Sequence, residues 1–378
     1  MQGGNIGIQM KHIVPETGSC NRRDIFLYLS AKQTIGGGQI QEYVPTVVFR
    51  CLMKTTLTFI TMLLLPACAS ACASAALPAD GDSKHTSNNK IPATADTLDV
   101  LFTGDVMLGR DVDRVIRHSG ADALFTPSID SLFASADAVV ANLECPATDI
   151  ESPLNKRFVF RARPDVLPVL RRHGVTHLNL ANNHSIDQGR RGLTDTYRNI
   201  IYAGMTPLGY GENAAEAARP QLIASSPRPV YMLSSLLVMS ENYVSMASRP
   251  GVCESSVGVL CDTIAALRRR CPTACIIVSL HWGTEHTLHP TLLQRADAHR
   301  LIDAGADAVI GHHSHTAQDV EVYRGRPVFY SLGNFIFDLD RPLNRRAVVA
   351  RLTIASDSLC FAAIPIEISR CRPKVAED

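Results

Sequence analysis

Short apolar runs alternate with stretches of helical spacing from residue 98 onward. The apolar runs have the length of strands and lie at residues 98–103, 138–141, 175–180, 229–238, 276–280 and 307–310. Helical spacing is found at residues 111–118, 164–173, 190–203, 255–270 and 290–304. Further strands are expected at residues 319–323, 327–331, 347–354 and 360–368. This order predicts an α/β domain over residues 98–370 that finishes in a run of strands.

Five of the apolar runs end in polar residues of the kinds that bind metals or transfer protons. These residues are Asp105, Asn142 with Glu144, Asn183 with His184, His281, and His313 with His315. Ligand sites in α/β sheets form outside the carboxyl ends of the strands, so five parallel neighbouring strands would bring the clusters to one rim. Each cluster alone also fits turn, capping or solvated-loop chemistry. Together they predict a metal site, and imidazole with carboxylate suits zinc, manganese or iron.

The pair His313 and His315 is the hardest of these clusters to explain by structure alone. Alternate residues of a strand share one face, so both imidazoles are expected to point the same way. A lone histidine after a strand, such as His281, is more often a hydrogen-bonded structural residue. The repeated histidine therefore favours a ligand role.

The same residues lie in motifs that resemble those of the CapA family of bacterial capsule-biosynthesis proteins, which is associated with poly-γ-glutamate synthesis and export. The motifs are Phe102–Met107 (FTGDVM), Asn142–Glu144 (NLE), Ala181–Gly189 (ANNHSIDQG), His281–Glu285 (HWGTE), Gly311–His315 (GHHSH) and Tyr330–Phe335 (YSLGNF). They follow the order of the family and extend from residue 98 to about residue 340. Each motif is weak alone, and the set is specific.

The CapA family in turn resembles the calcineurin-like metallophosphoesterases, whose fold is a four-layer α/β/β/α sandwich of two sheets flanked by helices. The resemblance implies that fold and a divalent metal for this chain. The ligands that it implies are Asp105, Glu144 or Asn142, Asn183, His281, His313 and His315. Met107 stands where the phosphoesterase motif has a histidine ligand, so the number of metals is left open.

The resemblance also implies roles for residues around the metal. His184 is placed like the general acid that protonates a leaving group. Asp187 is expected to orient His184, and Glu285 is a candidate second base or ligand. The candidates for binding an anionic substrate are Asn142, Arg110, Arg161 and Asn334. The arginines also fit ordinary solvated positions.

Residues 53–75 have the layout of a secretory signal, with Lys54 before a short apolar core and small residues after it. The core is too short for an ordinary transmembrane helix, and a buried helix is the alternative. The segment Leu65–Cys68 (LPAC) resembles the lipobox of bacterial lipoproteins, which predicts acylation of Cys68. Acylation of Cys72 and ordinary secretion are the alternatives. Because a signal works poorly behind a polar leader, residues 1–52 are expected to be a spurious extension.

Residues 76–97 are predicted to form a flexible linker, since most of them are Asp, Ser, Asn, Thr, Pro or Ala. Hydrophobic residues make up 46% of the chain and charged residues 19%, which excludes a disordered chain. The net charge of +1 provides no basic field for nucleic-acid binding. Seven cysteines follow the signal, and the sequence does not assign their pairing.

The sequence therefore predicts an exported, lipid-anchored protein of the cell envelope. We expect it to act in synthesis, export or trimming of an anionic surface polymer of the poly-γ-glutamate type, beside a polymer synthetase or exporter. The expected chemistry is metal-dependent hydrolysis. One alternative is a general envelope hydrolase of phosphoesters or peptide-like bonds, and the other is a non-catalytic scaffold that binds the polymer.

Overall fold

The computed structural model describes residues 7–11, 28–35, 39–43, 96–238 and 247–377. The predicted signal and lipobox at residues 53–75, with Cys68, and residues 76–95 of the predicted linker lie outside the described residues. Near the amino terminus, β1 (Gly7–Lys11), β2 (Tyr28–Ile35) and β3 (Gln39–Tyr43) form a small antiparallel sheet. The interpretation of residues 1–52 as a spurious extension stays a prediction.

The larger sheet has eight strands and begins with the first predicted apolar run. Its order is β19 (Arg372–Val375), β18 (Leu359–Ser369), β17 (Arg346–Ala355), β4 (Thr97–Val106), β5 (Ala138–Leu143), β6 (His177–Asn179) and β7 (Thr206–Leu208), and β16 (Asn334–Ile336) also pairs with β4. Strands β4 to β7 are parallel, whereas β17 runs antiparallel to β4. The carboxyl ends of β4, β5 and β6 therefore meet at one edge.

The second sheet has six strands. Its order is β14 (Val320–Tyr323), β15 (Arg326–Phe329), β13 (Ala308–His312), β12 (Cys275–His281), β10 (Val230–Leu236) and β9 (Gln221–Ala224). The four inner strands are parallel and the two edge strands are antiparallel. Every residue of β12 is buried, as expected for a strand covered on both faces. Two short strands, β8 (Tyr210–Gly211) and β11 (Gly251–Val252), pair separately.

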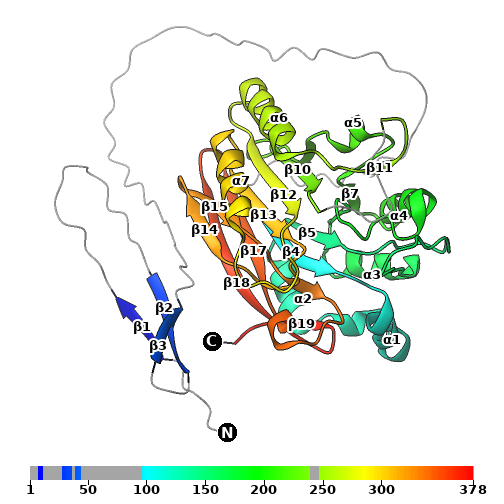
Figure 1. Cartoon of the computed structure of the whole chain (residues 1–378), viewed down its shortest axis with the longest axis horizontal. Helices are drawn as coiled ribbons and strands as arrows, with labels where there is room; N and C mark the ends of the chain where they lie inside the picture. Colours follow the sequence, from blue (N-terminus) through cyan, green and yellow to red (C-terminus); the bar gives the residue numbers. More distant parts are fainter. Residues whose placement is uncertain (1–6, 12–27, 36–38, 44–95, 239–246, 378) are drawn as a thin grey trace.

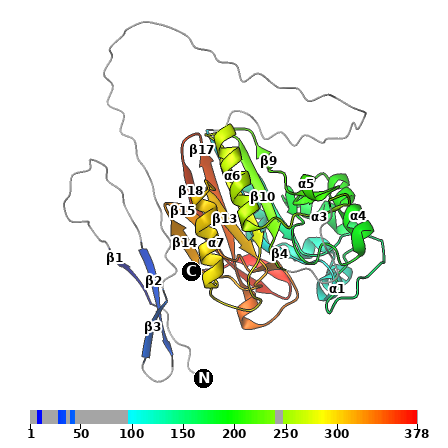
Figure 2. The ribbon, with the colours of Figure 1, turned by 45° about the horizontal axis from the view of Figure 1, so that its top comes forward.

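Helices cover the outer face of each sheet (Figures 1 and 2). The first apolar cluster joins the larger sheet to α1 (Arg110–Ser119), α2 (Pro127–Ala134), α3 (Leu167–Arg172) and α4 (Gly189–Tyr202). Another joins the second sheet to α6 (Val257–Arg270) and α7 (Leu292–Asp303). The remaining short helices are α5 (Ala214–Ala217), η1 (Ala121–Leu124), η2 (Pro164–Val166) and η3 (Pro342–Arg345). Helix α7 begins with a capping box between Thr291 and Gln294, which explains its start after Pro290.

The two sheets pack face to face through a third apolar cluster. Phe102 and Leu352 of the larger sheet contribute to it, together with Ile277, Ile310 and Phe329 of the second sheet. The layers are therefore helix, sheet, sheet, helix, and the predicted four-layer α/β/β/α sandwich is confirmed. Among the described residues, no helix combines the length and apolar character needed to cross a membrane. No disulfide bond joins any two of the seven described cysteines.

The expectation that five neighbouring strands carry the polar clusters is wrong in one respect. Strands β4, β5 and β6 belong to the larger sheet, whereas β12 and β13 belong to the second sheet. The clusters still converge because the sheets are stacked, and the Nδ1 atom of His312 on β13 lies 3.1 Å from Oδ1 of Asp105 on β4. The site is therefore built between two sheets.

Candidate metal centre

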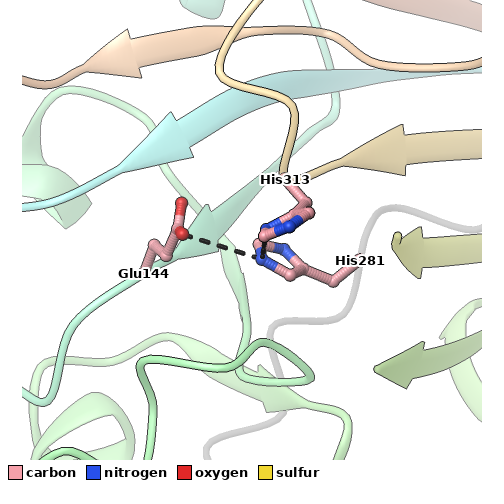
Figure 3. A group of neighbouring side chains, drawn as sticks. All are labelled: Glu144, His281 and His313. Atoms are coloured by element: carbon pink, nitrogen blue, oxygen red, sulfur yellow. Dashed lines mark hydrogen bonds and ion pairs between the residues drawn. The ribbon is translucent and has the colours of Figure 1, made fainter. Parts of the chain in front are cut away.

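Two overlapping groups of donor atoms lie between the carboxyl ends of the two sheets. The candidate donor atoms of Glu144, His281 and His313 all lie within 4.8 Å of one another. The same holds for Asp105, Glu144 and His315. All five residues are buried, and Glu144 belongs to both groups. Figure 3 shows Glu144 facing the imidazoles of His281 and His313.

The individual distances show how closely these side chains approach. Nε2 of His281 lies 3.6 Å from Oε1 of Glu144, and Nδ1 of His313 lies 3.1 Å from Nε2 of His281. His315 reaches both acids, with Nδ1 at 3.5 Å from Oδ2 of Asp105 and Nε2 at 3.8 Å from Oε1 of Glu144. Five of the six predicted ligands are thus brought together from distant parts of the chain, and Asn183 lies outside the two groups.

Neighbouring polar side chains hold these residues in place. The Asn142 side-chain amide donates to Oδ1 of Asp105 at 2.9 Å, and the Asn179 side-chain amide donates to Oδ1 of Asn142 at 3.1 Å. The backbone oxygen of His315 accepts a hydrogen bond from Asn344 at 2.7 Å, and its Nδ1 lies 3.0 Å from the Asn334 side-chain oxygen. Such bonds fix the orientation of a ligand before any metal binds.

The two carboxylates differ in their surroundings. Burial, followed by the charge of Asp105, raises the pKa of Glu144 well above its usual value. Burial also opposes ionisation of Asp105, but the bonds to His312 and His315 outweigh it and hold its pKa well below the usual range. Both Glu144 oxygens are buried without a hydrogen-bond partner among the described residues. An unpartnered buried carboxylate is costly unless a proton or a cation neutralises it.

The histidines favour the form that binds metals. Burial, followed by the charge of His313, lowers the pKa of His281 well below its usual value. Burial, followed by the charge of His315, lowers the pKa of His313 to about 4. Neutral imidazoles offer a lone pair, and the Asn183 side-chain oxygen is a further buried acceptor without a partner in the described part of the chain. This donor set fits a divalent cation bound by nitrogen and oxygen ligands.

A cleft of about 280 Å³ opens beside the donor groups. Its lining is Lys156, Phe158, Asn183, His184, Val238, Gly283, Thr284, Glu285 and His313. The Nδ1 atom of His184 lies 2.8 Å from Oδ2 of Asp187, and the Phe160 ring stacks on the imidazole at 4.1 Å. Burial lowers the pKa of His184, although the Asp187 bond acts in the opposite direction. His184 therefore lines the cleft with Nδ1 held by Asp187, and Nε2 is the ring nitrogen that Asp187 leaves available.

The four predicted substrate-binding residues do not gather in the cleft, unlike the candidate metal ligands, which lie together. Asn142 and Asn334 are fully buried and contact the candidate donors Asp105 and His315, and neither of them lines the cleft. Arg110 pairs with Asp338 at 3.0 Å and lies over the Phe160 ring. Arg161 lies 3.8 Å from Glu151 at the surface. Neither arginine lines the cleft.

The reason given above for the convergence of His313 and His315 is wrong. Strand β13 ends at His312, and the backbone φ angles of His313 and His315 are +93° and +54°. Their side chains are therefore aimed by a loop with left-handed backbone, not by strand alternation. Such strained conformations persist where the surroundings fix them, and they cluster at functional sites.

Met107 occupies the position where the phosphoesterase motif has a histidine ligand. Its side chain is fully buried, and its Sδ atom accepts a hydrogen bond from the Gly109 amide at 3.1 Å. It also belongs to the apolar cluster between the larger sheet and its helices. Met107 is therefore part of the packing behind the site. The two donor groups lack the histidine that the phosphoesterase motif has at this position.

Sequence reasoning missed three residues of the site. Lys156 lines the cleft from an irregular segment that carries no motif. His312 lies within the histidine motif, and its register opposite His281 on the neighbouring parallel strand was the signal for its position. Asn179 ends β6, one strand away from Asn142. Strand pairing, which the sequence does not display, connects His312 and Asn179 to the site, and Lys156 is connected only through its contacts with Asn183 and Asp187.

Comparisons with known proteins agree with the motifs. The family model described as bacterial capsule synthesis protein PGA_cap matches residues 99–339. The chain is 29% identical to the PGA biosynthesis protein CapA of Bacillus subtilis, over 74% of this chain and 73% of the relative. It is 31% identical to a probable polyglutamine synthesis accessory protein of Mycobacterium tuberculosis, over 73% of this chain and 86% of the relative.

Solved structures with similar folds are more distant. The NAD nucleotidase NadN of Haemophilus influenzae aligns with a TM-score of 0.44 and 10% identity, over 75% of this chain and 60% of that chain. A sulfate thiohydrolase SoxB of Thermus thermophilus aligns with a TM-score of 0.38 and 13% identity, over 68% of this chain and 45% of that chain. These distant likenesses assign no activity to the chain. The family match and the curated relatives decide its classification: the chain belongs to the CapA family of bacterial capsule synthesis proteins.

Proposed function

We propose that the chain is an exported accessory protein of anionic capsule synthesis that trims or releases the polymer by metal-dependent hydrolysis. The relatives named for PGA biosynthesis, capsule biosynthesis and polyglutamine synthesis support the polymer class. The observation that carries the chemistry is the Glu144 carboxylate, which is buried between two imidazoles with no hydrogen-bond partner among the described residues. A structural carboxylate in that position would be paired.

The proposed ligands are Asp105, Glu144, Asn183, His281, His313 and His315. Manganese, zinc and iron all suit this set of donors. The bound cation would supply electrostatic stabilisation of the negative charge that develops on a phosphoryl or acyl oxygen. The two donor groups share Glu144, which is compatible with one cation or with a shared carboxylate between two.

The chain's own residues would then handle the proton. His184 faces the cleft, and its bond to Asp187 fixes the ring so that Nε2 delivers a proton to the leaving group. Burial makes the protonated ring a stronger acid, because it lowers the pKa of His184. Glu285 lies at the rim of the same cleft with about half of its side chain exposed, where it is placed to accept a proton.

The proposed location is the outer face of the membrane. The signal at residues 53–75 and acylation of Cys68 would anchor the domain through the linker at residues 76–97. A polymer synthetase or exporter in the same membrane is the proposed partner. An anchored hydrolase would meet the polymer as it leaves the cell.

Elemental analysis with turnover assays tests the proposal. The full-length chain should contain a divalent metal and cleave poly-γ-glutamate in preference to peptidoglycan fragments and a generic phosphodiester. His184→Ala should retain the metal and lose about 10²–10⁴-fold in kcat, because it removes the acid and no ligand. Metal-loaded protein that cleaves none of the three substrates would refute the hydrolase and favour the polymer-binding scaffold. Preference for the phosphodiester would favour the general envelope phosphoesterase.

A further inference from the structure

Lys156 is a buried cation at the wall of the cleft that no motif indicated. Its side chain is 3% exposed, although it comes from a segment without helix or strand. Its ammonium group donates to Oδ1 of Asp187 at 2.5 Å and to the backbone oxygen of Asn183 at 2.7 Å. Lysine is rarely buried unless it is paired, so this placement calls for an explanation.

Each of the two acceptors belongs to a functional candidate. The first acceptor is the backbone oxygen of Asn183, and the side-chain oxygen of the same residue is a buried candidate ligand for the cation. Asp187 is fully buried, and its other oxygen accepts hydrogen bonds from Nδ1 of His184 at 2.8 Å and from the Phe160 amide at 2.7 Å. One ammonium group therefore touches both the proposed ligand residue and the carboxylate that orients the proposed acid.

Lys156 also settles which oxygen of Asp187 serves His184. A fully buried carboxylate needs a compensating charge, and Lys156 supplies it on Oδ1. Oδ2 is then left for the imidazole and the Phe160 amide. Without the ammonium group, Oδ1 of the carboxylate would lose its partner and the carboxylate could rotate, so the imidazole would lose its fixed acceptor.

The surrounding segment is tied down at several further points. The Ser152 backbone amide donates to the side-chain oxygen of Gln188 at 2.9 Å. The side-chain amide of Gln188 donates to the backbone oxygen of Phe160 at 3.1 Å. The Leu154 amide donates to the Asp187 carbonyl at 2.9 Å. Residues 152–160 are therefore clamped onto the turn that carries Asn183 and His184, and Lys156 is the charged part of that clamp.

We infer that Lys156 is a positioning residue of the cleft, which fixes Asn183 for the cation and His184 for proton transfer through one ammonium group. The expected effect on kcat rests on the proposed function, whereas the positioning of Asn183 and His184 rests on the geometry alone. A residue of this kind changes kcat and metal affinity by about 10–100-fold when it is removed.

The test compares Lys156→Met, Lys156→Arg and Lys374→Met in the full-length chain. Lys374 is a matched control because it also pairs with an acid, Glu367 at 3.0 Å, on an exposed strand away from the cleft. The measurements are the Mn²⁺ affinity by calorimetry, the hydrogen exchange of the Phe160 amide in metal-free protein, and kcat with KM for the best substrate. Lys156→Gln replaces Lys156→Met if the latter does not fold.

Lys156→Met should weaken Mn²⁺ binding about tenfold or more, lose protection of the Phe160 amide, and lower kcat about 10–100-fold with KM changed less than about threefold. Lys156→Arg should restore most of each value, because it keeps the charge and two donors, and Lys374→Met should match the wild type. Unchanged Mn²⁺ affinity and unchanged Phe160 protection in Lys156→Met would overturn the inference. If the wild type turns over no substrate, the proposed function fails, and these two measurements still decide the role of Lys156. If it binds no Mn²⁺, the Phe160 protection decides alone.

Discussion

The substitution Glu144→Gln should make the metal-free protein more stable at neutral pH. The amide has nearly the same shape as the carboxylate but carries no charge into the buried site. Burial, followed by the charge of Asp105, raises the pKa of Glu144 well above its usual value, so the ionised form is unfavourable in the folded protein. The substitution removes that unfavourable charge.

The size of the effect depends on pH. Below the unfolded pKa of about 4.5, Glu144 is protonated in both states and costs the fold no charge burial. As pH rises from there toward the raised folded pKa, only the unfolded state loses the proton, so stability falls by about 1.4 kcal/mol per pH unit. Between pH 5 and pH 7 the advantage of the variant should therefore grow, by at most about 3 kcal/mol, which is the limit for one proton over two pH units.

The informative quantity is the difference in the free energy of unfolding between the wild type and Glu144→Gln, because the buried histidines change stability with pH in the opposite direction to Glu144. Burial lowers the pKa of His281 and, to about 4, the pKa of His313. Their contribution to stability rises with pH up to the unfolded histidine pKa of about 6.5. The wild-type curve alone would therefore mix both trends, whereas the difference reports Glu144 together with its coupling to Asp105.

Urea unfolding at pH 5, 6 and 7 in the presence of a chelator measures this difference. Added Mn²⁺ at 100 times its Kd should then stabilise the wild type by about 2.7 kcal/mol and leave the variant unchanged. Glu367→Gln is the control, since Glu367 is an exposed partner of Lys374 and should show no such pH-dependent gain. A metal-free variant that is less stable than the wild type at pH 7 would refute the reasoning.

Three further outcomes are expected. His315→Ala should lose bound metal, measured by elemental analysis, while its circular dichroism is retained, because the imidazole reaches both acids but lies outside the apolar clusters. Gly311→Ala should destabilise the fold by about 2 kcal/mol or more in urea unfolding, because its new Cβ would lie 2.0 Å from the Tyr330 carbonyl oxygen. Cys68→Ser should move the protein from the membrane fraction to the soluble fraction of cells, and retention on the membrane would contradict acylation at that residue.

The strands were predictable because their apolar runs are short, continuous and bounded by polar residues. The run at residues 276–280 was predicted as a strand, and β12 covers Cys275–His281. Short elements were missed, among them β7 and β16, which have three residues each and show no periodicity. Helix α2 was missed as well, since Pro127–Ala134 offers only two turns of helical spacing.

The site was predictable in its members but not in its construction. The sequence identifies Asp105 and His281 as strand-end residues, yet it does not reveal that their strands belong to different sheets. That arrangement depends on the packing of apolar faces, which many side chains contribute together. The place of Lys156 in the site could not be predicted for a related reason. Its partner Asp187 is 31 residues away in the sequence, and only the fold brings the two together.

The loop after β13 shows why the donor groups are better explained by a ligand than by folding. His313 and His315 hold left-handed backbone, which costs a residue other than glycine of the order of 1–3 kcal/mol. Beside them, Glu144 is buried without a hydrogen-bond partner among the described residues. These costs are local, they act on three residues of one site, and the apolar clusters on either side do not require them. A cation in either donor group would offset the buried Glu144 charge and use one of the two strained imidazoles, so the same residues that weaken the metal-free fold are those that a metal would stabilise.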